Sequence, residues 1–185
     1  MNNPLIKKVN TMTDFDFGEG PVPAHQHPNG LGWVADTATV DASAYVGPDA
    51  QVYDYARVSN NAQVYNYAWV YDYARVSDNA QVYNYAWVRD YARVSDNAQV
   101  RDYAQVSGNA RVGGNAQVFD NAWVYDYARV SDNAQVCDNA RVSGDVWQAD
   151  AERKAAAAAA DPVSAVAHEV ITKEFEKRSV LRLEE

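Results

Sequence analysis

The three histidines carry the most versatile chemistry in this chain, and two of them stand together in the segment His25-Gln26-His27. Imidazole binds transition metals and exchanges protons near neutral pH, so a His-x-His pair can supply two metal ligands. In a trimer the pair would place six ligands around one axis. Such a short motif has little specificity, and a surface loop is the simpler interpretation, so we predict no metal site.

The other residue sets that enzymes use are missing from the sequence. The third histidine, His168, lies far from the pair, and no histidine occurs between residues 28 and 167. No Ser/His/Asp set, phosphate-binding glycine loop or paired-carboxylate site stands out. We therefore predict a protein that is not an enzyme and that uses no cofactor. The single Cys137 follows a repeating valine, where we expect it to face solvent as a tolerated replacement for serine.

Composition excludes two broad classes of partner. The chain has 185 residues and a formal net charge of −9, whereas a general nucleic-acid binder shows an excess of basic residues. No segment is apolar over the length that a membrane span requires. We therefore expect neither nucleic acid nor a membrane as a partner.

A six-residue repeat is the feature that would have to position any functional side chain. Valine recurs at every sixth residue from Val34 to Val142 without an insertion, and alanine stands two places before every one of these valines except the first. Period-two alternation predicts a short strand with Ala and Val facing inward. The Asp, Asn and Gly residues between these strands favour turns. Each repeat therefore predicts one short strand followed by one corner.

The residue between Ala and Val sorts into three classes with a period of 18 residues. The three columns are Thr39, Arg57, Arg75, Arg93, Arg111 and Arg129; Tyr45, Gln63, Gln81, Gln99, Gln117 and Gln135; and Trp33, Gln51, Trp69, Trp87, Gln105, Trp123 and Arg141. A plain six-residue repeat does not predict this sorting, but a three-sided coil does, because like residues then stack in ladders. We predict an all-β solenoid of about six triangular coils with parallel strands.

The Ala-x-Val-x-x-x array resembles the hexapeptide-repeat left-handed parallel β-helix, and the left hand of the coil is implied by this resemblance alone. The stretch HPNGLGWVADTATVDASAYVG with the repeats that follow it also resembles hexapeptide proteins of phages and prophages. Acyltransferases of this fold imply a catalytic histidine on a loop that leaves the coil. Its carbonic anhydrases imply three metal-binding histidines. The array contains neither feature.

Composition changes at both ends of the array, which predicts three sections. Residues 1–31 are rich in Pro, Gly and His and are expected to form an irregular lead-in, residues 32–147 the β-helix, and residues 148–185 a helical cap or anchor. An apolar stripe at three- and four-residue steps marks the second predicted helix of that last section. The anchor candidates on it are Val163, Val166, Val170, Ile171 and Phe175.

The arginine column stacks like charges, which is unfavourable unless they are compensated. Aspartates stand three residues before or after most of these arginines, for example Asp72 and Asp78 around Arg75. We expect these groups to pair into a solvated face. The alternative is a docking strip for an acidic partner. The glutamine column is expected to form amide ladders from coil to coil.

The aromatic residues suggest an interface. A solvent-facing aromatic wall that spans several coils is a large exposed patch, and such patches mark binding surfaces. We expect self-association as a parallel trimer, as in the family that the array resembles, with carbohydrate binding by the aromatic rings as the alternative. The interface candidates are Trp69, Trp87, Trp123, Tyr53, Tyr71, Tyr125, Tyr55, Tyr73 and Tyr127.

Together these features predict a non-enzymatic structural protein of a phage virion, either a capsid decoration or a short fibre, anchored to a capsid or other virion protein by one terminal section. One alternative is a cytoplasmic bacterial scaffold that polymerises through the ends of its β-helix. The other is a divergent hexapeptide acyltransferase, which would bind acetyl-CoA.

Overall fold

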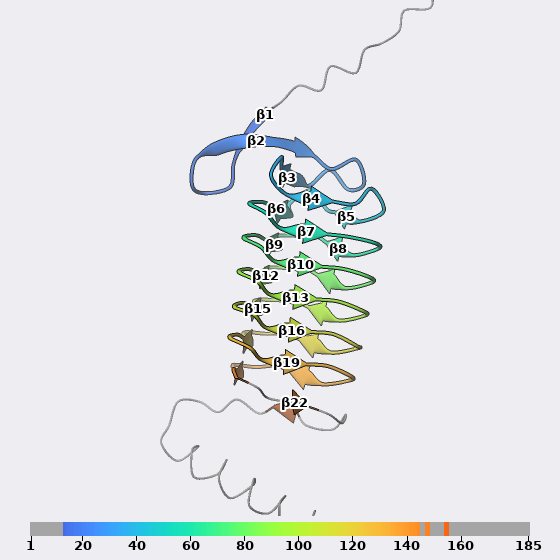
Figure 1. The fold of residues 1–185 in the computed structure, drawn as a ribbon, viewed down its shortest axis with the longest axis vertical. Helices are drawn as coiled ribbons and strands as arrows, with labels where there is room; N and C mark the ends of the chain where they lie inside the picture. Colours follow the sequence, from blue (N-terminus) through green and yellow to red (C-terminus); the bar gives the residue numbers. More distant parts are fainter. Residues whose placement is uncertain (1–12, 145–146, 149–153, 156–185) are drawn as a thin grey trace, which may run out of the picture.

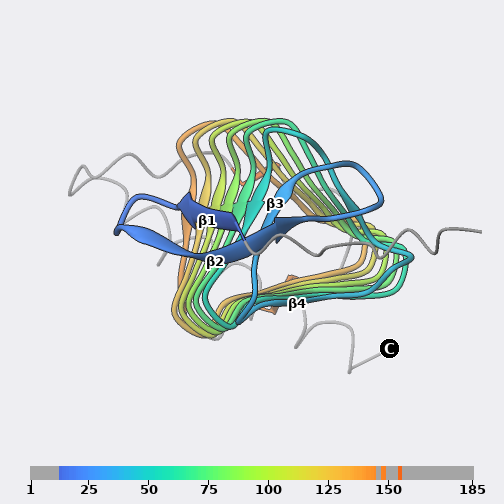
Figure 2. The same ribbon diagram turned by 90° about the horizontal axis from the view of Figure 1, so that it is seen from above.

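The computed structural model describes residues 13–144, 147–148 and 154–155, whose strands wind into about six stacked three-sided coils (Figure 1). Seen from above, successive coils superimpose closely, and one sheet forms each side of the prism (Figure 2). No helix occurs among the described residues. The all-β parallel solenoid predicted from the repeat is therefore confirmed. The helical section and its anchor candidates Val163, Val166, Val170, Ile171 and Phe175 lie outside the described residues.

The first side of the prism, which we call the tryptophan sheet, has nine strands in the order β1-β2-β3-β6-β9-β12-β15-β18-β21. Its strands are β1 (Thr13–Asp16), β2 (Pro21–Gln26), β3 (Trp33–Ala35), β6 (Gln51–Val52), β9 (Trp69–Val70), β12 (Trp87–Val88), β15 (Gln105–Val106), β18 (Trp123–Val124) and β21 (Arg141–Val142). From β3 onward all neighbouring strands are parallel and 18 residues apart, so that Trp69 lies beside Trp87.

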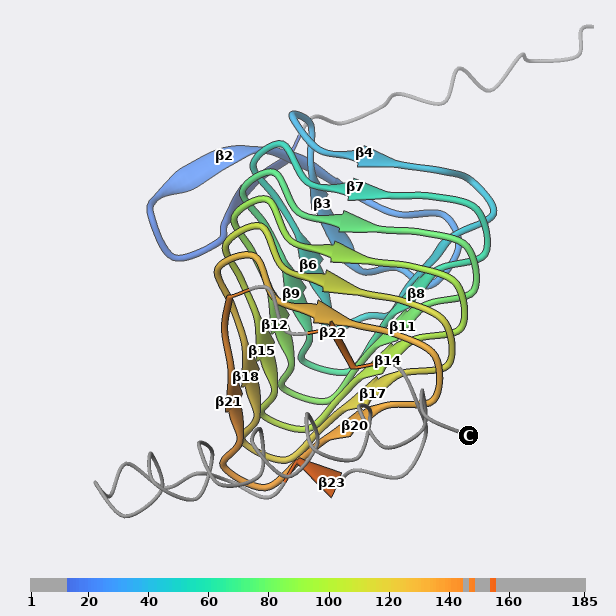
Figure 3. The same ribbon diagram turned by 60° about the horizontal axis from the view of Figure 1, so that its bottom comes forward.

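The other two sides are the seven-stranded arginine and glutamine sheets. The arginine sheet contains β4 (Thr39–Val40), β7 (Arg57–Val58), β10 (Arg75–Val76), β13 (Arg93–Val94), β16 (Arg111–Val112), β19 (Arg129–Val130) and β22 (Trp147–Gln148). The glutamine sheet contains β5 (Tyr45–Val46), β8 (Gln63–Val64), β11 (Gln81–Val82), β14 (Gln99–Val100), β17 (Gln117–Val118), β20 (Gln135–Val136) and β23 (Lys154–Ala155). The three columns predicted from the 18-residue period are thus three separate parallel sheets, which are visible as three walls in Figure 3.

Strict alternation builds the core. In each coil the alanine and valine on either side of the column residue point inward, and both are 0% exposed over most of the array, as at Ala74 and Val76. The column residue between them, here Arg75, points outward. Burial of about 25 cal/mol per Å² of apolar surface stabilises the stack, and every added coil extends the same dry column of alanine and valine.

The corners explain the Asp, Asn and Gly residues of the repeat. The second residue after each valine has a positive φ throughout the main array, for example 57° at Asp72 and 60° at Asp90. Asp and Asn tolerate this left-handed conformation better than other non-glycine residues. Several of these aspartates also join consecutive coils, since the backbone N–H of Asp90 donates to Oδ2 of Asp72 at 3.1 Å.

The expectation of an irregular lead-in over residues 1–31 is wrong for residues 13–26. β1 and β2 form an antiparallel hairpin, and β2 pairs antiparallel with β3. Phe15 stacks on Trp33 at 4.4 Å between ring centroids, and Phe17 stacks on Tyr53 at 5.0 Å. The Gly-rich turn hid an alternating strand whose phenylalanines continue the aromatic ladders of the array.

The lead-in also covers a second sheet edge at the same end of the prism. The side-chain amide of Asn29 donates to the carbonyl of Ala44 at 2.9 Å, and the backbones of Gly32 and Val46 bond at 2.9 Å. The first strands of the tryptophan and glutamine sheets therefore have part of their backbone polar groups satisfied within the chain, as buried or edge groups require. At the other end, Lys154–Ala155 pairs with Gln135–Val136 as a strand, although the sequence placed it in a helix. An open parallel edge outweighs the weak helix preference of two residues.

Candidate interaction faces

The outer surface of the tryptophan sheet carries stacked indole rings. Trp69 and Trp87 lie in adjacent coils with ring centroids 5.3 Å apart and planes within 2° of parallel. Gln105 takes the next place in the sheet, so Trp123 is separated from this pair and packs instead against the guanidinium of Arg141, 4.8 Å from its centroid. The ladder is thus interrupted at one coil.

Tyrosine ladders line the two corners that bound this sheet. Their ring planes lie within 10° of parallel. The centroid distances are 4.9 Å for Tyr53–Tyr71, 5.3 Å for Tyr55–Tyr73, 5.0 Å for Tyr73–Tyr91, 5.1 Å for Tyr67–Tyr85 and 5.2 Å for Tyr85–Tyr103. The structure therefore brings most of the aromatic interface candidates into continuous stacks along the prism.

Exposure divides the interface candidates into two groups. Tyr55, Tyr73 and Tyr127 are 57%, 48% and 64% exposed, and Trp123 is 39% exposed. The remaining five, Trp69, Trp87, Tyr53, Tyr71 and Tyr125, are half-buried. The corner tyrosines, rather than the central tryptophans, therefore form the most accessible part of the aromatic surface.

Stacking decides which part of each ring is available to a partner. A ring whose neighbours lie about 5 Å above and below it, as Tyr73 does between Tyr55 and Tyr91, presents its edge and hydroxyl group to solvent. Sugar rings bind aromatic side chains chiefly through the ring face, which is covered here. This geometry favours packing against another protein surface over carbohydrate stacking on these ladders.

A further tyrosine ladder lies at a corner of the glutamine sheet and was not singled out from the sequence. Tyr65 and Tyr83 stack at 4.9 Å, and the hydroxyl of Tyr65 donates to Oε1 of Gln81 at 3.3 Å. The 18-residue spacing of Tyr65 and Tyr83, equal to that of the glutamine column, was the signal that would have revealed it.

The half-buried tyrosines predict a loss of stability at high pH. Burial raises the pKa of Tyr53, Tyr65, Tyr71 and Tyr83 above the ordinary value for a phenol, because the ionised form loses solvation. Neighbouring carboxylates add to this effect at Tyr53 and Tyr71. A pKa that is higher in the folded than in the unfolded chain gives stability that is complete below pH of about 10 and is lost as pH rises further.

We expect phenolate absorbance to develop in two steps on alkaline titration, with the exposed tyrosines ionising first. The second step should coincide with unfolding followed by circular dichroism. The variant Tyr53→Phe/Tyr71→Phe should shift the unfolding transition to higher pH, because it removes two groups that must ionise when buried. An unchanged transition in that variant would contradict the assignment.

The arginine column differs from its expected state. No ion pair joins Arg57, Arg75, Arg93 or Arg111 to an aspartate within the described part of the chain. The described arginine–aspartate pairs are elsewhere, with N–O distances of 3.4 Å for Arg89–Asp90 and 2.8 Å for Arg101–Asp102. The predicted compensation by aspartates three residues away is therefore wrong for these four arginines.

The corner geometry explains this difference. The left-handed residue at each corner directs its carboxylate along the prism axis, toward the backbone of the next coil. Asp54 thus accepts the N–H of Asp72 at 3.2 Å, and Asp96 accepts that of Gly114 at 2.9 Å. The carboxylates satisfy backbone donors instead of guanidinium groups.

A groove of about 320 Å³ follows the arginine column over three coils. It is lined by Arg93, Ser95, Arg111, Val112, Gly113, Arg129, Val130 and Ser131. Small residues keep it open beside the long arginine side chains. At Gly113 a Cβ atom would lie 2.9 Å from Oδ2 of Asp96.

The two histidines of the His-x-His segment have separate contacts. Nδ1 of His25 lies 2.7 Å from Oδ1 of Asp36. His27 is buried at 3% exposure, and its Nδ1 lies 3.2 Å from the carbonyl oxygen and 3.3 Å from the N–H of Asn29. Each imidazole thus helps to fix the lead-in at the end of the prism.

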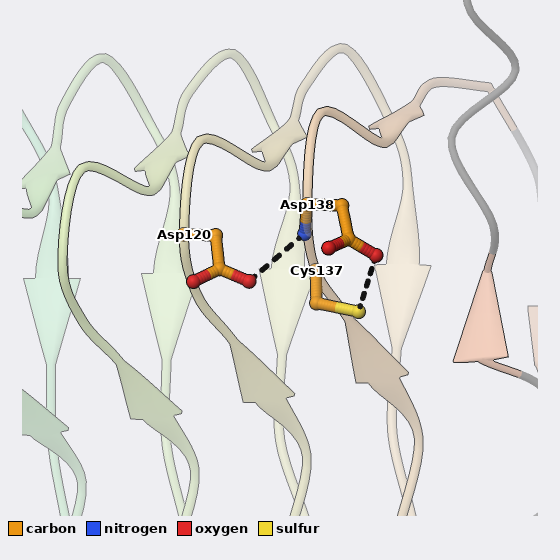
Figure 4. Close-up of side chains that lie close together, drawn as sticks. All are labelled: Asp120, Cys137 and Asp138. Atoms are coloured by element: carbon orange, nitrogen blue, oxygen red, sulfur yellow. Dashed lines mark hydrogen bonds between the residues drawn. The ribbon is translucent and has the colours of Figure 1, made fainter.

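Cys137 is buried at 2% exposure, so the expectation that it faces solvent is wrong. The residue after each core valine lies at the start of a corner where neighbouring coils cover part of it, and a small side chain is covered more completely. Its Sγ lies 3.4 Å from Oδ2 of Asp138, and Asp120 accepts the N–H of Asp138 at 3.1 Å (Figure 4). Ligand atoms of these three residues lie within 4.8 Å of one another, but the Asp120–Asp138 contact only repeats the inter-coil contact of Asp54 and Asp72.

Comparison with known proteins agrees with the fold. Residues 50–66, 104–116 and 134–148 match a family model described as YdcK Beta solenoid repeat. This similarity indicates a repeat β-solenoid, consistent with the parallel coils. No curated protein and no solved structure matches the chain. Within the described residues, no helix has the length and hydropathy needed to cross a membrane.

Proposed function

We propose that this β-solenoid is a non-enzymatic structural protein that self-associates as a parallel trimer through its aromatic ladders. The observation that carries the proposal is the continuous exposed edge formed by Tyr55, Tyr73 and Tyr91, which are 48–58% exposed along three consecutive coils. Aromatic residues are enriched at protein interfaces. Three rigid prisms of equal period can keep such ladders in register along their whole length.

The proposed setting is a phage virion, with the prism as a capsid decoration or short fibre attached to a capsid or other virion protein. This part of the proposal depends on the resemblance of the sequence to left-handed hexapeptide-repeat proteins of phages and prophages. The uninterrupted array supports a spacer role, because no described loop leaves the coils between Val46 and Val142 to build an active site.

The alternative scaffold would polymerise end to end. The hairpin over β3 and the contacts of Asn29 and Gly32 with the first coil oppose this at the N-terminal end of the prism. A polymer would need the same backbone edges that the lead-in occupies. Acetyl-CoA binding detected by calorimetry would favour the third possibility, a divergent acyltransferase.

We expect light scattering to give three times the chain mass for the full-length protein. The variant Tyr73→Lys/Tyr91→Lys should give the monomer mass, because two stacked charges would have to be buried in the interface. The matched control is Asn79→Lys/Asn97→Lys, which adds the same charge to exposed stacked residues on the glutamine side and should remain trimeric.

A monomeric wild-type protein, or a trimer that tolerates the tyrosine changes and not the asparagine changes, would refute the aromatic interface. Circular dichroism of both variants should show the wild-type fold, since all four side chains are exposed. A series of masses larger than a trimer would instead favour the end-to-end scaffold.

A further inference from the structure

The arginine column presents positive charge that the rest of the protein does not neutralise. Arg93 and Arg111 lie in paired strands of adjacent coils, about 4.8 Å apart along the prism. Neither forms an ion pair within the described residues. In a chain with a net charge of −9, a line of unpaired guanidinium groups is a local reversal of sign.

The reversal is strongest at Arg111. In neighbouring coils the corners before and after the arginine carry aspartates, such as Asp90 and Asp96 around Arg93. Around Arg111 both corner positions are glycines, Gly108 and Gly114, with φ values of 64° and 63°. The same backbone conformation is therefore kept while two negative charges are omitted. The groove of about 320 Å³ lies at this coil.

We propose that this groove binds the carboxylate groups of an acidic polysaccharide laid along the prism axis. Each guanidinium offers a planar pair of donors that matches a carboxylate. A linear chain of pyranose rings advances by about one coil spacing per ring, so that successive sugars meet successive coils. The hydroxyl groups of Ser95 and Ser131 line the same groove and can bond to the sugar hydroxyls.

Two other classes of acidic partner fit this groove less well. A protein partner needs an apolar anchor in its interface, and the only apolar side chains that line the groove, Val112 and Val130, are 1% exposed and belong to the core. Nucleic acid carries a denser negative charge, which the aspartates of the flanking corners and the net charge of −9 oppose. A polysaccharide with one carboxylate per sugar or fewer meets less repulsion.

The test measures binding of a defined oligogalacturonate to the full-length protein by isothermal titration calorimetry. We expect the variant Arg111→Gln to bind at least about tenfold more weakly, the effect of losing one charge-assisted bidentate contact. The control Arg101→Gln removes the same charge from an arginine that is paired with Asp102 at 2.8 Å at another corner and should bind as the wild type does. A second variant, Ser95→Asp, should abolish binding by placing a negative charge in the groove.

The chemistry of the ligand is tested with the methyl ester of the same oligomer, which keeps the sugar rings and loses the charges. We expect it not to bind. Equal binding of the ester, or equal binding by Arg111→Gln and wild type, would overturn the proposal. Tighter binding of poly-glutamate or of a single-stranded oligonucleotide at matched charge would overturn the assignment to a polysaccharide. None of these outcomes depends on the trimer, because the monomeric tyrosine variant keeps the arginine groove and can be titrated in parallel.

Discussion

A variant that lacks residues 86–103 folds and unfolds as cooperatively as the full-length protein, whereas one that lacks Tyr103 alone is strongly destabilised. The larger deletion removes one complete coil, since strands pair with partners 18 residues away. Tyr85 is then followed by Ala104, as it is normally followed by Ala86. All three columns stay in register, and only one layer of the core is lost.

The single-residue deletion acts through the corner and the strand that follows it. Either the corner loses a residue next to Asp102, which has a φ of 62°, or the next strand slips by one place. A slip turns Ala104 and Val106 outward and Gln105 into a core whose residues are 0% exposed. We expect a loss of roughly 4 kcal/mol or more in unfolding free energy.

Removal of residues 98–103 provides the intermediate case. It keeps the inward alternation of alanine and valine but moves every later column to the next side of the prism, so that Arg111 enters the tryptophan sheet. Ladders are then broken while the core is preserved. Urea denaturation of the three variants should rank them by size of deletion in the order 18, six and one residue, from most to least stable. A single-residue deletion as stable as the 18-residue deletion would contradict the register argument.

The variant Val76→Asp should be among the most damaging single substitutions, with an expected cost of about 4 kcal/mol or more. Val76 is 0% exposed and is surrounded by the alanine and valine column of the core. A carboxylate there has neither water nor a donor in reach. It must stay protonated or expel its strand from the stack.

The matched control introduces the same residue at the adjacent position of the same strand. Arg75 points outward, so Arg75→Asp should change the unfolding free energy by no more than about 1 kcal/mol. Urea denaturation followed by circular dichroism measures both variants. Similar losses in the two would mean that the inward and outward sides of β10 are not separated as described.

The sequence by itself determined the coils. Because side chains alternate with a period of two and the strands recur with a period of six, the Ala and Val positions had to be inward, and the 18-residue sorting of Arg, Gln and Trp required three sides. These features depend only on local backbone geometry repeated along the chain. The absence of a predictable long loop followed from the same regularity.

Contacts between coils decided what the sequence did not. Asp72 and Asp78 stand three residues from Arg75 and suggested ion pairs, but the left-handed corner directs such carboxylates to backbone N–H groups one coil away. Pairing with β3 made a strand of Pro21–Gln26, although its local composition favoured a loop. The direction of a corner side chain and the partner of an edge strand are set by groups distant in sequence, and for this reason only the tertiary structure revealed the unpaired arginines and the covered end of the prism.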